Sequence, residues 1–413
     1  MAETAVDAQV MKMKKVLFIV RDMKLGGVQK SILSFLQCFA GSEYQNQYEI
    51  HLLVLEPKGE LLSQVPQQIR RIQPGNLLRW MSSKMNKNLF TKFWSVRGFC
   101  GELRWLVQKK LHILPKQLNI EQKVWFSWKD SIPEHDEVYD IVVSYQDGES
   151  NYYAMDKVVA KKKVLWLHID YQKPGYDPVF DQRYYEACDA VVTVSENCRK
   201  CFLQVFPQFE DKTYVLENIT SADQILNQGN EPMELEYGQC TSTKILSVGR
   251  LNSQKGFDIA IDAAKLLRDT GVDFLWLVVG EGFERENLQK QIDLNGISDC
   301  FKLVGSRENP YAYMKACDIL VQSSRYEGKP IVLDEAKIFC KPIVSTNYST
   351  VNASIEHGKS GWIVDMTPQA LCEGILRIME DEKLRDALTG YLETQPKGNI
   401  QELKRYIQVM LEG

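Results

Sequence analysis

Short apolar segments alternate with helical patterns along this chain, and the alternation occurs twice. In the first half, segments with strand character fall at 14–20, 49–55, 138–145, 163–168, 190–195 and 213–216, and a helix is expected over 28–39. In the second half they fall at 244–248, 274–279, 301–304, 318–322, 342–346 and 361–364, and the last helix follows Pro368. Parallel strands joined by crossover helices produce this pattern. The sequence therefore predicts an α/β fold with two parallel sheets.

The stretch 217–243 separates the two series, because it is polar and poor in periodicity. We expect two Rossmann-like domains, an N-terminal one over 1–217 and a C-terminal one over 218–413. A chain of 413 residues with 44% hydrophobic content can supply two cores. Because open parallel sheets bind ligands at the carboxyl ends of their strands, we expect a cleft between two facing domains.

The segment SSRYEGKPIVLDEA (323–336) holds Glu327 and Glu335 with seven residues between them. A strand is expected to end near Ser323 and a helix to begin at Pro330, whose fixed φ suits a first helical position. A helix start attracts phosphate, and Gly328 lets the backbone approach a ligand. A carboxylate on either side could then accept hydroxyl groups of a sugar and of a ribose, which together describe a nucleotide sugar. Alternatively, Glu327 is a favourable charge at a helix start and Glu335 an exposed helical residue.

A second pattern, ILSVGRLNSQKGFD (245–258), places two cations where a strand ends at Gly249. The guanidinium of Arg250 can fork onto phosphate oxygens, and the ammonium of Lys255 can act as a point charge. Both suit a diphosphate. The alternative is that they are solvated loop charges.

With these motifs the chain resembles the retaining GT-B glycosyltransferases of the family 4 type, particularly those of bacterial capsule and cell-surface polysaccharide synthesis. The resemblance spans nearly the whole chain. It rests on MKLGGVQKSILSFL with its Gly26-Gly27 turn, SVGRLNSQKGFD, GEGFERENL (280–288) and the Glu-x7-Glu pair in RYEGKPIVLDEAKI. It implies a GT-B fold and transfer of a sugar, with retention of configuration, from a nucleotide-diphosphate sugar to a glycan or lipid-linked acceptor in polysaccharide biosynthesis.

The resemblance also implies residue roles. Arg250 and Lys255 would bind the donor diphosphate, Glu327 the transferred sugar and Glu335 the ribose. The Gly26-Gly27 turn would approach the donor phosphates from the opposite domain, and His168 in VLWLHID would lie near the transferred sugar. The expected catalytic residues are His168, Glu327, Arg250 and Lys255, and the expected donor-binding residues are Gly26, Gly27, Arg250, Lys255, Glu327, Gly328, Lys329, Pro330 and Glu335.

Two other function classes stay open at this point. One is a non-catalytic nucleotide-sugar-binding protein, and the other is a sugar-nucleotide epimerase or hydrolase of similar architecture. The sequence has no H-E-x-x-H and no D-x-D, and its five histidines are far apart. We therefore expect no metal site and no cofactor, with metal-independent catalysis in which the cations stabilise the leaving diphosphate.

The segment 77–130 is basic and aromatic. From Arg70 to Lys129 there are thirteen Lys or Arg against two Glu, and this stretch holds five of the eight tryptophans. With an amphipathic helix expected around 89–111, it favours contact with an anionic membrane surface over binding to nucleic acid, although packed aromatics beneath a solvated face are an alternative. Ten scattered cysteines fit a reducing compartment. We expect a cytoplasmic protein, peripheral on the inner face of the membrane.

Overall fold

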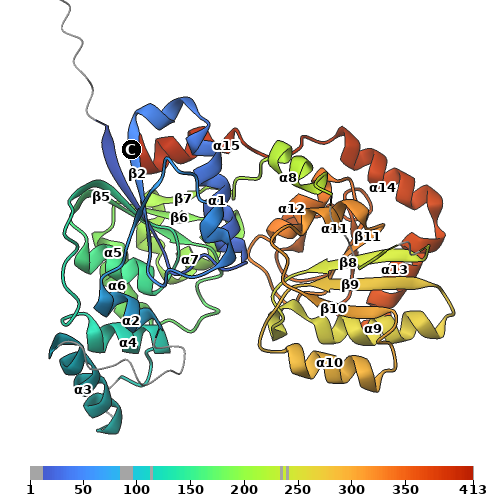
Figure 1. The fold of residues 1–413 in the computed structure, drawn as a ribbon, viewed down its shortest axis with the longest axis horizontal. Helices are drawn as coiled ribbons and strands as arrows, with labels where there is room; N and C mark the ends of the chain where they lie inside the picture. Colours follow the sequence, from blue (N-terminus) through green and yellow to red (C-terminus); the bar gives the residue numbers. More distant parts are fainter. Residues whose placement is uncertain (1–12, 84–95, 112–114, 233–235, 239–240, 413) are drawn as a thin grey trace, which may run out of the picture. The chain divides into compact units, whose positions relative to one another are not determined.

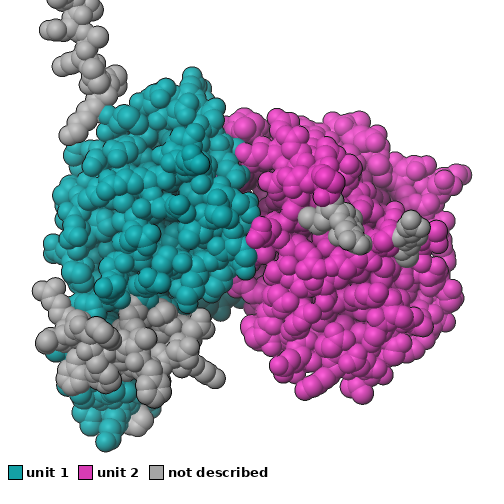
Figure 2. All heavy atoms as spheres, viewed as in Figure 1, with its two compact units in different colours: residues 1–24, 35–216, 403–413 teal, residues 25–34, 217–402 magenta. Residues whose placement is uncertain are grey.

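The computed structural model describes residues 13–83, 96–111, 115–232, 236–238 and 241–412. The chain forms two compact units (Figure 2), unit 1 being Met1–Lys24, Phe35–Leu216 and Leu403–Gly413, and unit 2 being Leu25–Ser34 and Glu217–Glu402. The main boundary between the units follows Leu216, one residue before the expected boundary at 217/218. The segment Leu403–Gly413, which the sequence interpretation placed with the C-terminal domain, belongs to unit 1.

Unit 1 is built on a parallel sheet of seven strands in the order β3-β2-β1-β4-β5-β6-β7. The strands are β1 (Lys14–Val20), β2 (Tyr48–Val54), β3 (Arg70–Ile72), β4 (Tyr139–Ser144), β5 (Ala160–Leu167), β6 (Ala190–Thr193) and β7 (Thr213–Val215). The order reverses between β1 and β4, which is the arrangement of a doubly wound sheet.

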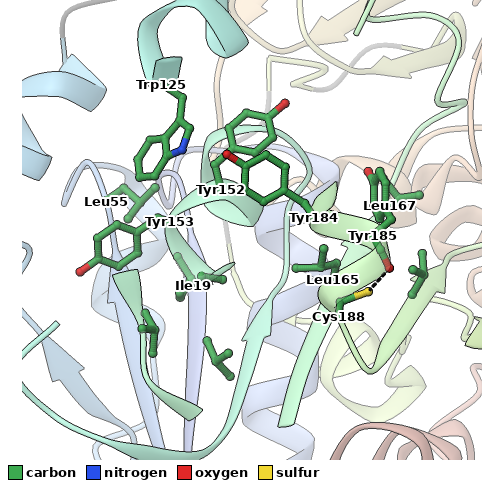
Figure 3. Close-up of a cluster of buried hydrophobic side chains, with 14 of the residues drawn as sticks. Ile19, Leu55, Trp125, Tyr152, Tyr153, Leu165, Leu167, Tyr184, Tyr185 and Cys188 are labelled. Atoms are coloured by element: carbon green, nitrogen blue, oxygen red, sulfur yellow. Dashed lines mark hydrogen bonds between the residues drawn. The ribbon is translucent and has the colours of Figure 1, made fainter. Parts of the chain in front are cut away.

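Alternate residues of these strands face two different helical layers, because side chains in a strand alternate between the sheet faces. On one face Leu17, Ile19 and Leu165 pack with aromatic residues that include Trp125 and Tyr152 (Figure 3). The helices on this side are α2 (Asn76–Ser83), α4 (Ile120–Trp128), α5 (Glu149–Lys157), α6 (Pro178–Ala187) and α7 (Glu196–Val205), and α3 (Val96–Lys110) packs on α4.

The segment that begins at Leu403 belongs to unit 1 because it packs on the opposite face of this sheet. Phe18 and Trp166 lie there, and Tyr406 of α15 (Glu402–Tyr406) packs 5.1 Å from Trp166 and 5.5 Å from Phe35, centroid to centroid. Phe35 belongs to α1 (Gly27–Ala40), and η6 (Ile407–Glu412) follows α15. Burial of these large rings holds the C-terminal helix on unit 1.

Unit 2 contains a parallel sheet of six strands in the order β10-β9-β8-β11-β12-β13. The strands are β8 (Thr243–Val248), β9 (Phe274–Val279), β10 (Phe301–Gly305), β11 (Ile319–Gln322), β12 (Ile343–Thr346) and β13 (Trp362–Val364). Again the order reverses, here between β8 and β11.

Unit 2 has a separate core on each face of its sheet. Trp276 and Val278 join the cluster of α9 (Phe257–Asp269), α10 (Arg285–Leu294), α13 (Pro368–Glu380) and α14 (Glu382–Thr394). Leu275 and Leu277 join the cluster of α11 (Tyr311–Ala316) and α12 (Ile331–Ile338), beside which α8 (Ala222–Gly229) packs (Figure 1). The near-continuous apolar β9 is thus explained, because helices cover both faces.

The prediction of two Rossmann-like parallel sheets is confirmed, and every expected strand is present with ends shifted by at most three residues. The sequence analysis missed β3, whose first two residues are exposed arginines, and α8, which lies in the expected junction. The expected helix around 89–111 is present as α3 from Val96, and the part of this prediction before residue 96 lies outside the described residues. In the part of the chain that the structure describes, the helices are too short or too polar for a membrane span.

Candidate active site

The predicted cations and Glu327 come together at the carboxyl ends of two adjacent strands of unit 2. Strands β8 and β11 pair in parallel, with Ile245 opposite Ile319. The loop after β8 carries Arg250 and Lys255, and the loop after β11 carries Glu327. We call them the 249–256 loop and the 323–330 loop. Parallel pairing places both loops at one edge of the sheet, where open α/β sheets bind ligands.

Direct contacts join the two loops. The hydroxyl of Ser323 donates to the carbonyl of Lys255 at 2.9 Å, and the amide of Arg325 donates to the carbonyl of Gln254 at 2.7 Å. The guanidinium of Arg325 also binds both carboxylate oxygens of Asp258, at 2.8 and 2.6 Å. Such a bidentate pair fixes orientation as well as distance. The sequence analysis did not single out Arg325 or Asp258, although both lie within the quoted motifs.

Two glycines allow the close approach of backbone segments here. Gly256 has φ +62°, and a Cβ on it would lie 2.1 Å from the carbonyl oxygen of Ser323. A Cβ on Gly280, which opens GEGFERENL, would lie 1.8 Å from the carbonyl oxygen of Gly249. Any other residue at either position would push the loops apart. The glycines in these motifs therefore shape the site.

Lys255 and Glu327 form an ion pair at the centre of this site. The ammonium of Lys255 lies 2.6 Å from Oε1 of Glu327, and both side chains are largely buried. The same oxygen accepts from the hydroxyl of Ser324 at 2.6 Å and from the amide of Gln322 at 3.2 Å. The other oxygen, Oε2, has a longer contact of 3.4 Å to Gln254. Oε1 is thus the anchored oxygen, and Oε2 has capacity left to accept a ligand hydroxyl.

Arg250 is exposed, and among the described residues its guanidinium has no ion pair or hydrogen bond. Residues 25–34 belong to unit 2, and they lie beside it: a Cβ on Gly26 would stand 3.2 Å from Nη2 of Arg250. A Cβ on Gly27 would stand 4.0 Å from the side chain of Ile331, the first residue of α12. The double glycine, Arg250 and the start of α12 are therefore neighbours within unit 2.

Helix α12 begins at Ile331, with Pro330 as its N-cap instead of its first residue, and no side chain of the described residues caps its first turn. Free N–H groups at a helix start favour an anion. Glu335 lies in the second turn and is buried, so the alternative of an exposed helical residue is wrong. Its Oε1 accepts from the hydroxyl of Tyr311 at 2.8 Å and lies 3.2 Å from the ammonium of Lys30. The sequence analysis did not predict Tyr311 or Lys30 as partners.

The ammonium of Lys329 lies 2.5 Å from Oε2 of Glu217 and 4.0 Å from Oδ2 of Asp334. Its side chain is 11% exposed. Its charge is therefore compensated by carboxylates, unlike that of Arg250. The donor-binding role of Lys329 stays a prediction.

His168 lies in unit 1, directly after β5, packed beside Tyr145 and Trp166. Burial lowers the pKa of its imidazole to about 3, although a hydrogen bond with the backbone of Tyr145 opposes this shift. Nε2 is buried and has no partner among the described residues. At neutral pH the imidazole ring is therefore uncharged. It can donate or accept a hydrogen bond, but it carries no positive charge.

Unit 1 also carries charged residues after β1 and β4 that the sequence analysis missed. Arg21, after β1, binds Glu121 at 2.9 Å, and the hydroxyl of Tyr176 contacts both Glu121 and Asp147. Burial raises the pKa of Asp147 to about 6 and that of Glu149 to about 7. Both follow β4 within YQDGES. Acidic residues directly after a buried strand could have been identified from the sequence as candidate site residues.

Residues 239–395 match the family model described as "Glycosyl transferases group 1". The matched segment contains both loops, the Lys255–Glu327 pair and Glu335. The prediction of an enzyme of the transferase class is confirmed: the chain is a glycosyltransferase.

Curated relatives agree with this assignment. An uncharacterised glycosyltransferase of Methanocaldococcus jannaschii is 24% identical over 292 residues, which cover 61% of this chain and 72% of that protein. The amylovoran biosynthesis glycosyltransferase AmsK of Erwinia amylovora is 34% identical over 148 residues, 34% of this chain and 36% of AmsK. A Campylobacter jejuni N-acetylgalactosaminyltransferase, named for a diphospho-undecaprenol acceptor, is 26% identical over 215 residues, 52% of this chain and 57% of that protein.

The fold of the glycosyltransferase is that of solved GT-B structures. HepE of Anabaena, in a complex with UDP and glucose, superimposes with a TM-score of 0.66 at 17% identity, over 97% of this chain and 99% of HepE. WaaG, a glycosyltransferase of lipopolysaccharide biosynthesis, gives a TM-score of 0.59 at 17% identity, over 96% of this chain and 100% of WaaG. The fold-class prediction is confirmed.

Proposed function

We propose that this glycosyltransferase transfers a sugar from a nucleoside-diphosphate sugar to a glycan or lipid-linked acceptor in polysaccharide biosynthesis, with retention of configuration. The observation that carries the proposal is the pair of joined loops at the edge of the unit 2 sheet, with Arg250 unpaired, Lys255 held on Glu327 and the first turn of α12 uncapped. The complex of HepE with UDP and glucose makes UDP-sugars the first donors to test.

The reaction requires negative charge to be stabilised on the departing diphosphate. Arg250 would fork onto its oxygens, and Lys255 would contribute a second cation while still bonded to Glu327, because an ammonium has three donors. The N–H groups at the start of α12 add partial positive charge. Fixed groups of this kind need no reorganisation during the reaction. Chemistry without a metal is part of the proposal.

Two carboxylates would bind the hydroxyls of the sugar and of the ribose. Oε2 of Glu327 would accept a hydroxyl of the transferred sugar, while Ser324, Gln322 and Lys255 hold Oε1 in place. Glu335 would accept from the ribose hydroxyls. His168 would offer the free ring nitrogen of a neutral imidazole to the sugar.

The membrane surface is the proposed location of the acceptor. On α3, Leu103, Leu106 and Val107 are exposed and form a stripe opposite the side on which Gly101 and Trp105 pack. Lys109, Lys110 and Arg104 are exposed on or beside this stripe. An apolar stripe with basic neighbours suits the interface of an anionic membrane.

Two of the tryptophans in this segment follow the alternative of packed aromatics. Trp125 and Trp128 are fully buried in unit 1 (Figure 3, Trp125), so they serve the core and cannot insert into lipid. Trp94, Phe90 and Phe93 lie outside the described residues. The proposed membrane contact therefore depends on the aliphatic stripe of α3.

A donor and acceptor screen tests the function. The purified chain is incubated with UDP-, GDP-, ADP- and dTDP-sugars, with and without undecaprenyl-diphosphate-linked sugars, and release of the nucleoside diphosphate is measured. We expect acceptor-dependent release with one donor class. Binding of a donor without release would favour the non-catalytic sensor, and acceptor-independent release would favour a hydrolase. Isomerisation of the intact donor would favour an epimerase.

A further inference from the structure

Lys30 of α1 reaches the carboxylate of Glu335, the residue proposed to bind the ribose. Its ammonium lies 3.2 Å from Oε1 of Glu335, across 305 positions of the chain. Residues 25–34 belong to unit 2, and the buried hydroxyl of Ser31 donates to Oδ1 of Asn218 at 2.7 Å. Two adjacent residues of α1 thus bind unit 2, and one of them contacts the proposed donor site.

The two oxygens of the Glu335 carboxylate have different surroundings. Oε1 accepts from the ammonium of Lys30 and, at 2.8 Å, from the hydroxyl of Tyr311. Burial, to which the charge of Glu335 adds, raises the pKa of Tyr311 well above its ordinary value, so the phenol keeps its proton and donates it. Within the described part of the chain, Oε2 makes no hydrogen bond. Oε1 is therefore anchored, and Oε2 keeps its lone pairs for a ligand hydroxyl.

Lys30 compensates the charge of Glu335. The side chain of Glu335 is 3% exposed and that of Lys30 is 19% exposed, so solvent screens this pair poorly. The ammonium also lies 4.9 Å from the centroid of the Tyr311 ring, a distance that suits a cation–π contact. Two kinds of contact therefore keep the ammonium at this carboxylate.

The other charged groups on α12 and on the helices beside it do not replace this cation. They have partners of their own or carry negative charge: Asp334 pairs with Lys337 on α12, Lys315 of α11 bonds to Asn230, and α8 carries Asp223. Among the described residues, Lys30 is thus the cation that pairs with Glu335.

We propose that Lys30 is a positioning residue for ribose recognition. Together with Tyr311 it holds Oε1, and its charge keeps the carboxylate of Glu335 ionised, so that Oε2 can accept the hydroxyl groups of the ribose. An ionised carboxylate accepts stronger hydrogen bonds than a neutral acid, and a fixed Oε1 sets the direction of Oε2. This inference rests on the proposed function, because it describes how Glu335 would perform the role proposed for it.

Loss of Lys30 has a consequence that loss of a merely structural contact would not have. A buried carboxylate without a cation takes up a proton more readily, since burial disfavours the charged form. In Lys30→Met, Glu335 should therefore be protonated at the lower pH and ionised at the higher pH. The preference for ribose over dideoxyribose should follow the same pH dependence.

Calorimetric titration at pH 6 and at pH 8 tests this. The probes are UDP, GDP and ADP, and the one that binds the wild type is compared with its 2′,3′-dideoxy form. The readout is the ratio of the two affinities, because both nucleotides carry the same phosphates and the titration of those phosphates cancels. In the wild type we expect the same ratio at both pH values. In Lys30→Met the ratio should fall roughly 10-fold at pH 6 and recover at pH 8.

Two further variants at this position separate charge from contact. Lys30→Arg keeps the charge and should keep the wild-type ratio at both pH values. Lys30→Gln keeps a hydrogen-bond donor without the charge, so it should show the same pH dependence as Lys30→Met, and it carries the test if Lys30→Met does not fold. Lys265→Met, which removes an exposed lysine paired with Asp269 on α9, is the matched control and should behave like the wild type.

The inference alone is overturned if the uncharged variants keep the wild-type ratio, or if their ratio falls equally at both pH values. If the wild type binds none of the three nucleotides, or binds the dideoxy form as tightly as the ribose form, the proposed donor site is wrong and the inference falls with it.

Discussion

The ammonium of Lys255 lies 2.6 Å from Oε1 of Glu327, although the two residues are 72 positions apart in the chain. The contact forms because β8 and β11 are adjacent and because Gly256 lets their loops approach. Glu327 is thereby held by a cation that would also face the diphosphate. One ion pair thus links the residue expected to bind the sugar to the residue expected to bind the leaving group.

Breaking this pair from either side should reveal its energetic coupling. Lys255→Met leaves the carboxylate of Glu327 largely buried without its cation, so we expect a loss of roughly 1–3 kcal/mol in the free energy of unfolding. Adding Glu327→Gln should recover part of this loss, because the uncompensated charge disappears. Urea unfolding of the wild type, both single variants and the double variant gives the coupling energy. Strictly additive effects would show that the pair contributes nothing.

Arg250 should matter for turnover and not for stability. Because its guanidinium is exposed and unpaired in the described part of the chain, Arg250→Ala should change the free energy of unfolding by less than about 0.5 kcal/mol. Turnover should fall about 10²–10³-fold, as for one lost preorganised donor. Lys290→Ala, at an exposed cation on α10, is the control. A chelator should leave wild-type turnover unchanged, and activity that is lost to chelator and regained with metal would contradict the proposed mechanism.

Glu335 should discriminate between ribose and deoxyribose. Glu335→Gln loses a charge-assisted hydrogen bond to the ribose, so its affinity for ribonucleotide donors should fall roughly 10- to 100-fold. Affinity for the 2′,3′-dideoxy donor should change far less. Calorimetric titration of both donors into the wild type, the variant and the control Glu286→Gln checks this. If Glu335→Gln weakens both donors equally, the carboxylate acts through Tyr311 and Lys30 and does not contact the ribose.

Glu149 should make stability depend on pH. Burial raises the pKa of this carboxyl to about 7, although the Ser82 hydroxyl and Arg21 oppose the shift. Between its ordinary value and about pH 7, the folded state binds more protons than the unfolded state, so this group's contribution to stability increases as the pH falls through that window. Glu149→Gln should therefore raise the free energy of unfolding by roughly 1–3 kcal/mol at pH 8 and by much less at pH 5. Urea unfolding at both pH values is the measurement.

The exposed Glu134→Gln serves as the control for that experiment and should show no such difference. An equal effect of Glu149→Gln at both pH values would mean that Glu149 stays ionised in the folded protein.

The aliphatic stripe of α3 should bind anionic lipid. Replacing Leu103, Leu106 and Val107 by Ser removes exposed apolar surface, so stability should hardly change while cosedimentation with phosphatidylglycerol liposomes falls. Salt should weaken binding of the wild type, because the attraction to basic residues is screened over about 10 Å at 0.1 M. Leu294→Ser, at an exposed leucine of unit 2, is the control. Wild-type protein that stays in solution at low salt would disprove the membrane contact.

The strand pattern and the positions of the motifs could be predicted from the sequence because they depend on local properties. A short apolar run such as Phe274–Val279 predicts a strand by itself, whichever sheet that strand later joins. Parallel sheets then place the loop residues at strand ends, which is why Arg250, Lys255 and Glu327 could be grouped before their contacts were known.

Burial and pairing could not be predicted in the same way, because they depend on residues far away in the chain. From the sequence alone, Glu335, Trp125 and Lys329 can each be either exposed or buried. Tertiary packing decided that Glu335 is buried against Tyr311 and Lys30 and that Trp125 belongs to the core. It also decided that Lys329 pairs with Glu217. The physical reason is that local sequence sets the conformation of a segment, whereas the environment of a charge is set by whatever other segments pack around it.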